Sequence, residues 1–343
     1  MRKGTNPAKN IDNKVKTDDF HQVIVPVYLP NLEGYYKEGL DILKLCLESI
    51  VLTSHNKTYI SVVNNGSCVE VKAYLNELLQ VGKIHEVIHT TAIGKINAIA
   101  KGLAGHNFDL VTITDADVLF INGWQKAVYE IYETFPRAGM VGTTPQPMLF
   151  KTYNEKIFFD NFFNPNFKFY NVNQELKEDI KKMYSTTIGL NHPKSKYHFK
   201  KILAISKKNL KSVVGNGHFT ATYKSELLKY LKNLTAKEKM GGSGLNVSLD
   251  EPSVKHGHWR LCTFKNYTYH MGNIKESWMD KKINLIKTQS KSFDLKQPQF
   301  KAYKSSLPVS FIRGLVRKFF IRTFLFKDFL TKKGLTRKEA EIY

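Results

Sequence analysis

The sequence has few cysteines, no long apolar run and a shortage of acidic residues relative to basic ones. Its three cysteines, Cys46, Cys68 and Cys262, are far apart and lack metal-ligand spacing, which argues against a disulfide framework and for a reducing compartment. No stretch of about 18 apolar residues occurs, so the sequence predicts no membrane-spanning helix. The first residues contain no apolar segment, and we therefore expect no signal peptide.

The net charge of +22 arises from 52 basic and 30 acidic residues. Such an excess favours a polyanionic partner, which could be a nucleic acid, an anionic membrane surface or a phosphorylated ligand. No helix-turn-helix, zinc-finger or RNP pattern is present, so nucleic acid is not the expected partner. A non-enzymatic protein that binds polyanions stays open as an alternative of a different class, because the charge would suit it.

Segments typical of strands and helices alternate along the first part of the chain. With 42% hydrophobic residues the chain can build a large α/β domain, and the alternation predicts a mostly parallel sheet wound by helices. Residues 148–210 interrupt this pattern; they are rich in Phe, Tyr, Asn and Lys and suit an inserted cap or substrate-facing region better than a core. The expected strands are 22–27, 59–63, 84–88, 109–114 and 139–142.

Two aspartates close one of these strands and are the most informative feature of the chain. The apolar residues of 109–114 predict a buried strand, and Asp115-Ala-Asp117 follows at its carboxyl end, where open α/β sheets bind ligands. With one residue between them the side chains start on opposite faces, so a local turn must redirect one. Two hard oxygen ligands suit Mg²⁺ or Mn²⁺, which can carry a diphosphate. A polar turn, with Asp117 capping a helix, is the simpler alternative.

Six short motifs follow one another between about residues 20 and 275: Val23-Ile-Val-Pro-Val-Tyr28, Val62-Val-Asn-Asn-Gly-Ser67, Gly94-Lys-Ile-Asn97, Asp115-Ala-Asp117, Leu249-Asp-Glu-Pro252 and Tyr269-His-Met-Gly-Asn273. In this order and spacing the chain resembles family 2 glycosyltransferases of the GT-A fold. The resemblance implies an α/β domain at 20–285 with a Rossmann-like, mostly parallel sheet and an inserted acceptor-side region. Its nucleotide-sugar half would be 20–125 and its acceptor half 126–285.

The resemblance places five residues beside the nucleotide sugar. Pro26 and Tyr28 would line the nucleotide pocket, where Tyr28 could stack on a base or simply pack on a neighbour. Asn64 stands where the family usually has an Asp that reads the base or ribose; an amide brings no charge, and turn chemistry is its alternative role. Lys95 would offset phosphate charge at a helix start, with Asn97 nearby, unless both are ordinary polar residues of that helix start.

A divalent cation is the expected cofactor, either Mn²⁺ or Mg²⁺. Under the same resemblance Asp117 is the direct metal ligand, and Asp115 contacts the ribose or reaches the metal through water. His270 ends an extended run and could complete the site, although a structural histidine is the alternative.

Asp250 and Glu251 stand where the family carries its general base. Direct displacement at an anomeric carbon requires a carboxylate that removes a proton from the acceptor hydroxyl. We assign this role to Asp250, while Glu251 precedes Pro252 and could bind the acceptor instead. The order Asp-Glu reverses the Glu-Asp that the family often shows, and acidic residues that merely open a helix are the alternative.

The expected function is therefore an inverting, metal-dependent transfer of a sugar from a nucleotide diphosphate sugar to a glycan or lipid-linked acceptor, in bacterial surface-polysaccharide assembly. A haloacid-dehalogenase-type phosphatase also has a D-x-D motif, but nearer its amino terminus. A sugar nucleotidyltransferase would have a glycine-rich loop in place of Pro26-Val-Tyr-Leu-Pro30. An inactive scaffold of the same fold stays open, because Asn64 is unusual.

Basic segments are expected at both ends, a mobile tail at 1–19 and an aromatic helical extension at 286–343. In 311–327 two adjacent helical columns would form one broad apolar face flanked by basic residues. Such a helix could lie on an anionic membrane surface or pack on the catalytic domain. A lipid-linked acceptor favours the membrane, so we expect a cytoplasmic protein held at the inner face of the cell membrane. The two columns are Phe311, Leu315, Phe319 and Ile312, Val316, Phe320, Phe324.

Overall fold

The computed structural model describes Gly4 and residues 18–343, apart from 188, 193, 234–241, 290–296, 300–307 and 322. Most of the predicted tail at 1–19 and the first part of the 286–343 extension therefore lie outside the described residues. Within the part of the chain that is described, no helix is both long and apolar enough to cross a bilayer.

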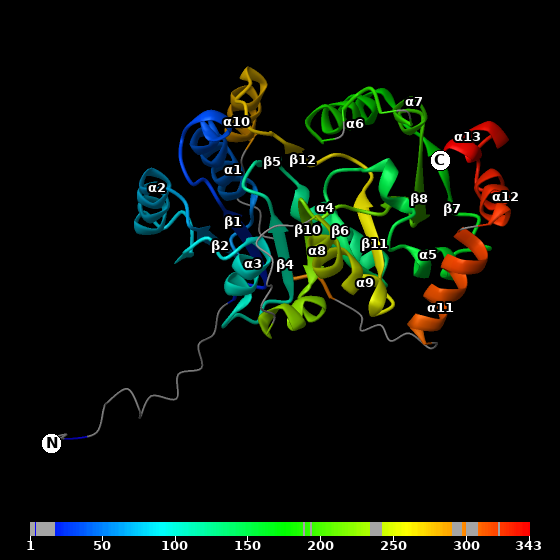
Figure 1. Cartoon of the computed structure of the whole chain (residues 1–343), viewed down its shortest axis with the longest axis horizontal. Coiled ribbons are helices and arrows are strands. Elements are labelled where there is room, and N and C mark those ends of the chain that lie inside the picture. Colours follow the sequence, from blue (N-terminus) through cyan, green and yellow to red (C-terminus); the bar gives the residue numbers. More distant parts are fainter. Residues whose placement is uncertain are drawn as a thin grey trace.

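A ten-stranded sheet in the order β3-β2-β1-β4-β10-β6-β11-β9-β8-β7 forms the centre of the molecule (Figure 1). Strands β3, β2, β1 and β4 are parallel to one another, as are β6 and β11, whereas β10 and the β9-β8-β7 meander pair antiparallel with their neighbours. The strands are β1 His21–Val27, β2 Thr58–Asn65, β3 Glu86–Thr90, β4 Leu110–Thr114, β6 Ala138–Gly142, β7 Phe167–Asn171, β8 Lys201–Lys207, β9 Leu210–Val214, β10 Thr220–Lys224 and β11 Trp259–Thr263.

Helices cover both faces of this sheet (Figure 1), which confirms the predicted α/β architecture of the GT-A type. A separate two-stranded sheet, β5 Val118–Phe120 with β12 Thr268–His270, lies next to the carboxyl end of β4. The main helices are α1 Gly39–Thr53, α2 Val69–Gln80, α3 Lys95–Leu103, α4 Trp124–Thr134, α5 Glu155–Asp160, α6 Gln174–Thr187, α7 Ser195–His198, α8 Gly242–Leu245, α9 Glu251–Lys255, α10 Ser277–Gln289, α11 Val309–Leu315, α12 Phe324–Lys332 and α13 Arg337–Ile342.

The residues of β1 explain why helices are needed on both sides. Val23 and Val25 belong to the core cluster that includes residues of α1, while Ile24 points to the opposite face and belongs to the cluster that includes residues of α3. Side chains alternate along a strand, so an uninterrupted apolar strand must be covered twice. Gly102 lets α3 approach closely, because a Cβ there would lie 2.9 Å from Ile24. The packing fixes the carboxyl ends of β1, β2 and β4 along one edge.

The region 148–210 corrects one expectation from the sequence. Its aromatic side chains Phe150, Phe158 and Phe167 are fully buried, so they form core rather than the surface of a cap. The region also contributes β7 and β8, which extend the central sheet. Asn and Lys residues interrupt the aromatic ones, so the sequence showed no helical or strand periodicity there. The rings that bury these aromatic residues lie near the C-terminal end of the chain.

That C-terminal end packs on the domain through one of its two predicted apolar columns. Ile312 and Val316 are buried, and Phe320 contacts aromatic rings of the 148–210 region. The expected single helix is interrupted, because α11 continues as a π-helical segment to Ile321 and α12 begins afresh at Phe324. Phe324 therefore does not continue the column of Ile312, Val316 and Phe320, in which the sequence placed it, and is 73% exposed.

We expect the aromatic cluster around Phe329 to carry much of this docking. Phe329 is 4% exposed, and its ring lies within 6.5 Å of five other phenylalanine rings. Phe329→Ala should lower the free energy of unfolding by about 3 kcal/mol, since it leaves a cavity between the tail and the domain. Phe324→Ala is the matched control and should change it by less than about 0.5 kcal/mol. Equal effects in denaturant titrations would show that the tail is not packed in this way.

Candidate active site

Asp115 lies at the carboxyl end of β4, where the sequence placed it. Its backbone N–H donates to Phe219 O at 2.8 Å, which holds the end of β4 against the strand partner β10. Its carboxylate forms an ion pair with Lys95, the first residue of α3. Gly94 precedes that helix with φ at +92°, a conformation that favours glycine and turns the chain so that Lys95 faces the strand end.

Asp117 sits on the other side of the turn and pairs with His270. His270 Nε2 lies 3.4 Å from Asp117 Oδ2, and the pairing of β12 with β5 sets this approach, supported by Met271 N–H donating to Asp117 O at 2.8 Å. Asp117 Oδ1 is buried and has no hydrogen-bond partner among the described residues. Burial, together with the charge of Asp115, raises the pKa of Asp117 against the opposing charges of His270 and Lys95.

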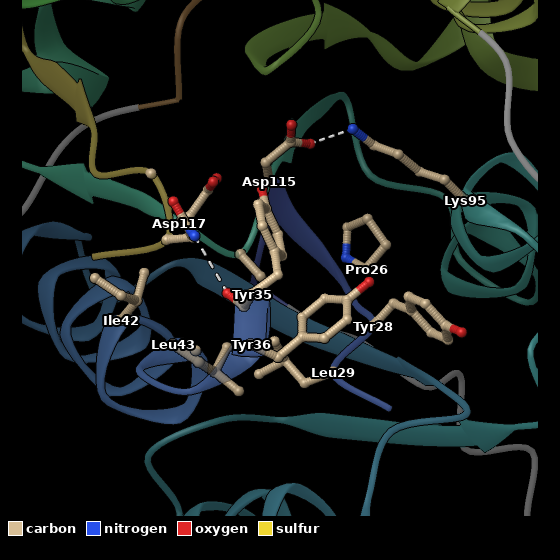
Figure 2. Close-up of a pocket in the computed structure, with 14 residues that line it drawn as sticks. Pro26, Tyr28, Leu29, Tyr35, Tyr36, Ile42, Leu43, Lys95, Asp115 and Asp117 are labelled. Carbon is tan, nitrogen blue, oxygen red and sulfur yellow. Dashed lines mark hydrogen bonds and ion pairs between the residues drawn. The ribbon is translucent and has the colours of Figure 1, made fainter. Parts of the chain in front are cut away.

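A cleft of about 220 Å³ opens beside these carboxylates. Figure 2 shows Lys95 reaching Asp115 at one edge, with Tyr28 and Tyr36 toward the opposite edge; Tyr35 also lines the cleft. Tyr28 and Tyr35 are 42% and 69% exposed, so their rings are free to contact a ligand. The remaining lining residues are Pro26, Leu29, Gly39, Ile42, Leu43, Ala116, Asp117, Gly272 and Asn273.

Two residues expected beside the nucleotide are engaged elsewhere. Asn64 is 3% exposed; its Oδ1 accepts from Ser67 N–H at 2.9 Å and its Nδ2 contacts His89 at 3.0 Å. Asn97 donates to Ile93 O at 2.8 Å. Neither residue lines the cleft. These contacts match the turn and helix-start roles that the sequence left open.

Asp250 is a buried carboxylate between two basic side chains. Its Oδ2 lies 3.0 Å from His218 Nδ1, and its Oδ1 lies 3.1 Å from Arg260 Nη2. Arg260 is 2% exposed and also donates to the carbonyls of Thr152, at 2.7 Å, and Asn216. Its Oδ2 is thus held by His218, whereas Oδ1 is buried beside Arg260 without a hydrogen bond among the described residues.

Glu251 follows Asp250 but faces the C-terminal tail. It pairs with Arg313 of α11 at 2.6 Å and with Lys255 at 2.9 Å. Burial alone would raise the pKa of Glu251, but the hydrogen bonds and charges of Arg313 and Lys255 together lower it. Glu251 thus contacts the tail, whereas Asp250 contacts His218 in the loop before β10, whose Phe219 accepts the backbone hydrogen bond from Asp115.

Sequence reasoning missed several of these participants. His218 and Arg260 come from the loop before β10 and from β11, and neither lies in a motif that signals chemistry. Tyr35 lines the cleft from a short 3₁₀ turn at Gly34–Tyr36, and Asn273 donates to its carbonyl at 3.2 Å. The Gly215-Asn-Gly217 turn was the available signal for His218, because a glycine-rich turn between strands often positions the residue after it.

The metal ligands expected from the sequence lie close together, but they do not all face one point. In the described part of the chain, no three carboxylate, imidazole or thiol groups gather as a ready-made protein site. Asp117 and His270 are adjacent, whereas Asp115 is turned towards Lys95. Two protein ligands and an unpartnered carboxylate oxygen still suit a cation such as Mg²⁺, which commonly takes one or two carboxylates plus phosphate oxygens of its substrate.

Comparison with known protein families identifies the family of the chain. Residues 23–195, half of the chain, match the sequence profile of glycosyl transferase family 2. The chain belongs to glycosyl transferase family 2. The matched segment contains β1, Lys95 and the Asp115-Ala-Asp117 turn, while Asp250 and His270 lie beyond it. A search of curated proteins gives no match.

Solved structures of glycosyltransferases also resemble the chain. A mannosyltransferase from Pyrobaculum calidifontis, in complex with GDP-Man and Mn²⁺, is 17% identical over 72% of this chain and 55% of its own, with a TM-score of 0.38. S. aureus TarS residues 1–349 in complex with UDP-GlcNAc is 15% identical over 80% of this chain and 68% of its own, with a TM-score of 0.42. In another structure of S. aureus TarS, this chain covers 40% of the TarS chain. The family assignment rests on the profile match alone.

Proposed function

We propose that this family 2 glycosyltransferase moves a sugar from a nucleotide diphosphate sugar to a hydroxyl acceptor, with inversion and with Mn²⁺ or Mg²⁺. The observation that carries the proposal is that Lys95, Asp115 and Asp117 line a single cleft, with His270 paired to Asp117 behind that lining. A lysine and a divalent cation side by side suit a diphosphate, which leaves with two negative charges to be offset.

The aromatic end of the cleft would bind the nucleoside. Tyr28 and Tyr35 present exposed rings, and Pro26 at the end of β1 forms the adjacent wall. Because Asn64 is committed to Ser67 and His89, base recognition would depend on these rings and on backbone groups. Stacking tolerates more than one base, so the geometry favours a nucleoside without choosing between uridine and guanosine.

The cation would bind to Asp117 and His270. Asp117 offers its free Oδ1, and His270 lies beside it. When bound, the metal would neutralise charge on the departing diphosphate. Lys95 would add a point charge from the start of α3, which requires its ion pair with Asp115 to open or to be shared with the phosphates.

The acceptor would approach from the side of Asp250. We assign the side of proton removal to Asp250 rather than Glu251, because Glu251 faces the C-terminal tail, where it pairs with Arg313 and Lys255. A fixed base near the anomeric carbon supports direct displacement on the face opposite the leaving group, and therefore inversion. Surface-polysaccharide assembly is the role we propose for this reaction, with a glycan or lipid-linked acceptor.

The C-terminal tail supports a lipid-linked acceptor. While one apolar column packs on the domain, the other remains outside: Phe311 and Phe319 are 64% and 61% exposed. Arg317 and Lys318 lie between them on an exposed stretch of the chain. An exposed aromatic column with adjacent cations suits an anionic bilayer surface, where each basic residue adds on the order of 1 kcal/mol. We propose that this face holds the enzyme at the inner side of the cell membrane.

Vesicle sedimentation tests the tail. Phe311→Ser combined with Phe319→Ser should abolish binding to anionic vesicles without lowering thermal stability, since both rings are exposed. The wild-type protein should release vesicles at high salt, because the charges are screened. Val69→Ser with Val81→Ser is the matched control, on exposed positions at the ends of α2, far from the tail (Figure 1). Unchanged binding by the phenylalanine variant would remove the membrane proposal.

A donor screen tests the function itself. Wild-type protein should release a nucleoside diphosphate from at least one nucleotide sugar in a panel, with Mn²⁺ or Mg²⁺ present and not in excess chelator. A protein that instead shifts oligonucleotides and hydrolyses no donor would support the polyanion-binding alternative.

A further inference from the structure

Asp250 is poorly placed to touch an acceptor directly. The residue is 5% exposed, and each carboxylate oxygen already faces a basic group. Arg260 cannot move away easily, because it also holds the carbonyls of Thr152 and Asn216. A base that must accept a proton from an incoming hydroxyl needs more access than this.

His218 has that access. Its side chain is 23% exposed, compared with 6% for Asp250. Its Nδ1 faces Asp250, and since an ionised carboxylate only accepts hydrogen bonds, Nδ1 carries the proton and Nε2 keeps a free lone pair. The next residue, Phe219, accepts the backbone hydrogen bond from Asp115, and its ring meets His270 edge-on at 5.8 Å. Phe219 therefore links the loop that carries His218 to the proposed phosphate end of the cleft.

We propose that His218 Nε2 is the catalytic base of this chain and that Asp250 is its positioning residue. This proposal rests on the proposed function and refines its base. As the acceptor oxygen forms its bond to the anomeric carbon, its O–H bond breaks and the proton passes to Nε2. The bond from the anomeric carbon to the diphosphate oxygen breaks with its electron pair, and the nucleoside diphosphate leaves. The imidazolium, held by Asp250, then loses its proton to solvent.

Asp250 contacts His218 directly, and two further elements carry charges next to Asp250 and next to Phe219. Asp250, at the end of the π-helical segment Asn246–Asp250, favours the imidazolium that forms during the reaction. Arg260 of β11 stands behind Asp250 and partly offsets it. Asp115 follows β4 and adjoins the neighbouring residue Phe219, with Lys95 beside it. The arrangement orients the ring and compensates its charge during transfer, as a carboxylate–imidazole pair does in other enzymes.

Kinetics separate this assignment from a carboxylate base. With the best donor of the screen and water as acceptor, His218→Gln should lower kcat by on the order of a hundredfold and leave the donor KM within about threefold. The double variant with Asp250→Asn should be no slower than the slower single variant, because the two residues act as a unit. His256→Gln, an exposed histidine of the same region, is the control.

The pH profile adds a readout that a structural role would not move. An imidazole base places the acid limb of kcat about two pH units above that of an aspartate base. We expect the wild-type enzyme to lose kcat on the acid side of its pH profile at that higher pH, and we expect this fall in kcat to be absent from the profile of His218→Gln. If His218→Gln stays within threefold of wild type while Asp250→Asn is crippled, Asp250 is the base and the proposal is overturned.

Nitrogen NMR of the full chain tests the pair without any substrate. The wild-type imidazole signals that disappear in His218→Gln belong to His218. At neutral pH they should show a ring protonated on Nδ1 and unprotonated on Nε2, and Asp250→Asn should change that tautomer. A ring protonated on Nε2, or on both nitrogens, would contradict a free base at Nε2. If no donor is hydrolysed, the proposed function fails, and the NMR result still decides whether the pair exists.

Discussion

Replacing Asp117 with alanine should abolish donor turnover. Asp117 Oδ1 has no hydrogen-bond partner among the described residues, and Oδ2 lies 3.4 Å from His270 Nε2, so the substitution would remove the proposed main ligand for the cation. We expect kcat for the best donor to fall about a thousandfold, equivalent to ~4 kcal/mol of lost charge stabilisation. Initial rates of nucleoside diphosphate release with saturating Mn²⁺ would measure this.

The same variant should fold as well as the wild type. The pKa of Asp117 is raised, mainly by burial, and a carboxyl whose pKa is higher in the folded state lowers stability at pH values above its unfolded pKa. Asp117→Ala should therefore leave the melting temperature unchanged or higher at pH 7. Asp41→Ala, at an exposed aspartate of α1, is the control and should keep full activity. Full turnover by Asp117→Ala, or by wild type in excess chelator, would contradict a metal role.

Asp250→Asn is the second large effect that we expect. The amide cannot stabilise positive charge or accept a proton, so transfer should fall by on the order of a hundredfold or more. Donor affinity should change little, because Asp250 acts on the acceptor side and is not part of the cleft lining. Binding of the donor by calorimetry and turnover under the same conditions would separate the two effects.

Glu251→Gln is the matched comparison. It removes a charge that pairs with Arg313 and Lys255, so it should loosen the tail and leave turnover within a few-fold of wild type. A crippled Glu251→Gln beside a mild Asp250→Asn would reverse the assignment of the two acidic residues.

Local sequence patterns were sufficient to predict β1, β2, β3, β4 and β6 and the place of Asp115 at a strand end. An apolar strand followed by Asp115-Ala-Asp117 can be recognised because the strand and its ligands are contiguous, and the structure puts Asp115 at the end of β4. The sequence predicted that a local turn must redirect one of the two aspartates; in the structure Asp115 faces Lys95 and Asp117 faces His270. The roles assigned to these residues stay predictions until the variants are measured.

The rest of the site depends on contacts that no local pattern encodes. His218 and Arg260 approach Asp250 from residues 32 and 10 positions away, and a histidine after a glycine turn looks the same in sequence whether or not a carboxylate meets it. The aromatic core of 148–210 was likewise missed, because its partner rings lie in α12. In each case tertiary packing, rather than propensity, determines the outcome.

Calorimetric titration of nucleoside diphosphates into the wild-type protein tests the central claim most directly. The account predicts that at least one of UDP, GDP, CDP and dTDP binds in the presence of Mn²⁺, and that binding is lost in excess chelator and in Asp117→Ala. Absence of binding by all four nucleotides, or equal binding with and without the cation, would contradict a metal-assisted nucleotide-sugar site in this cleft.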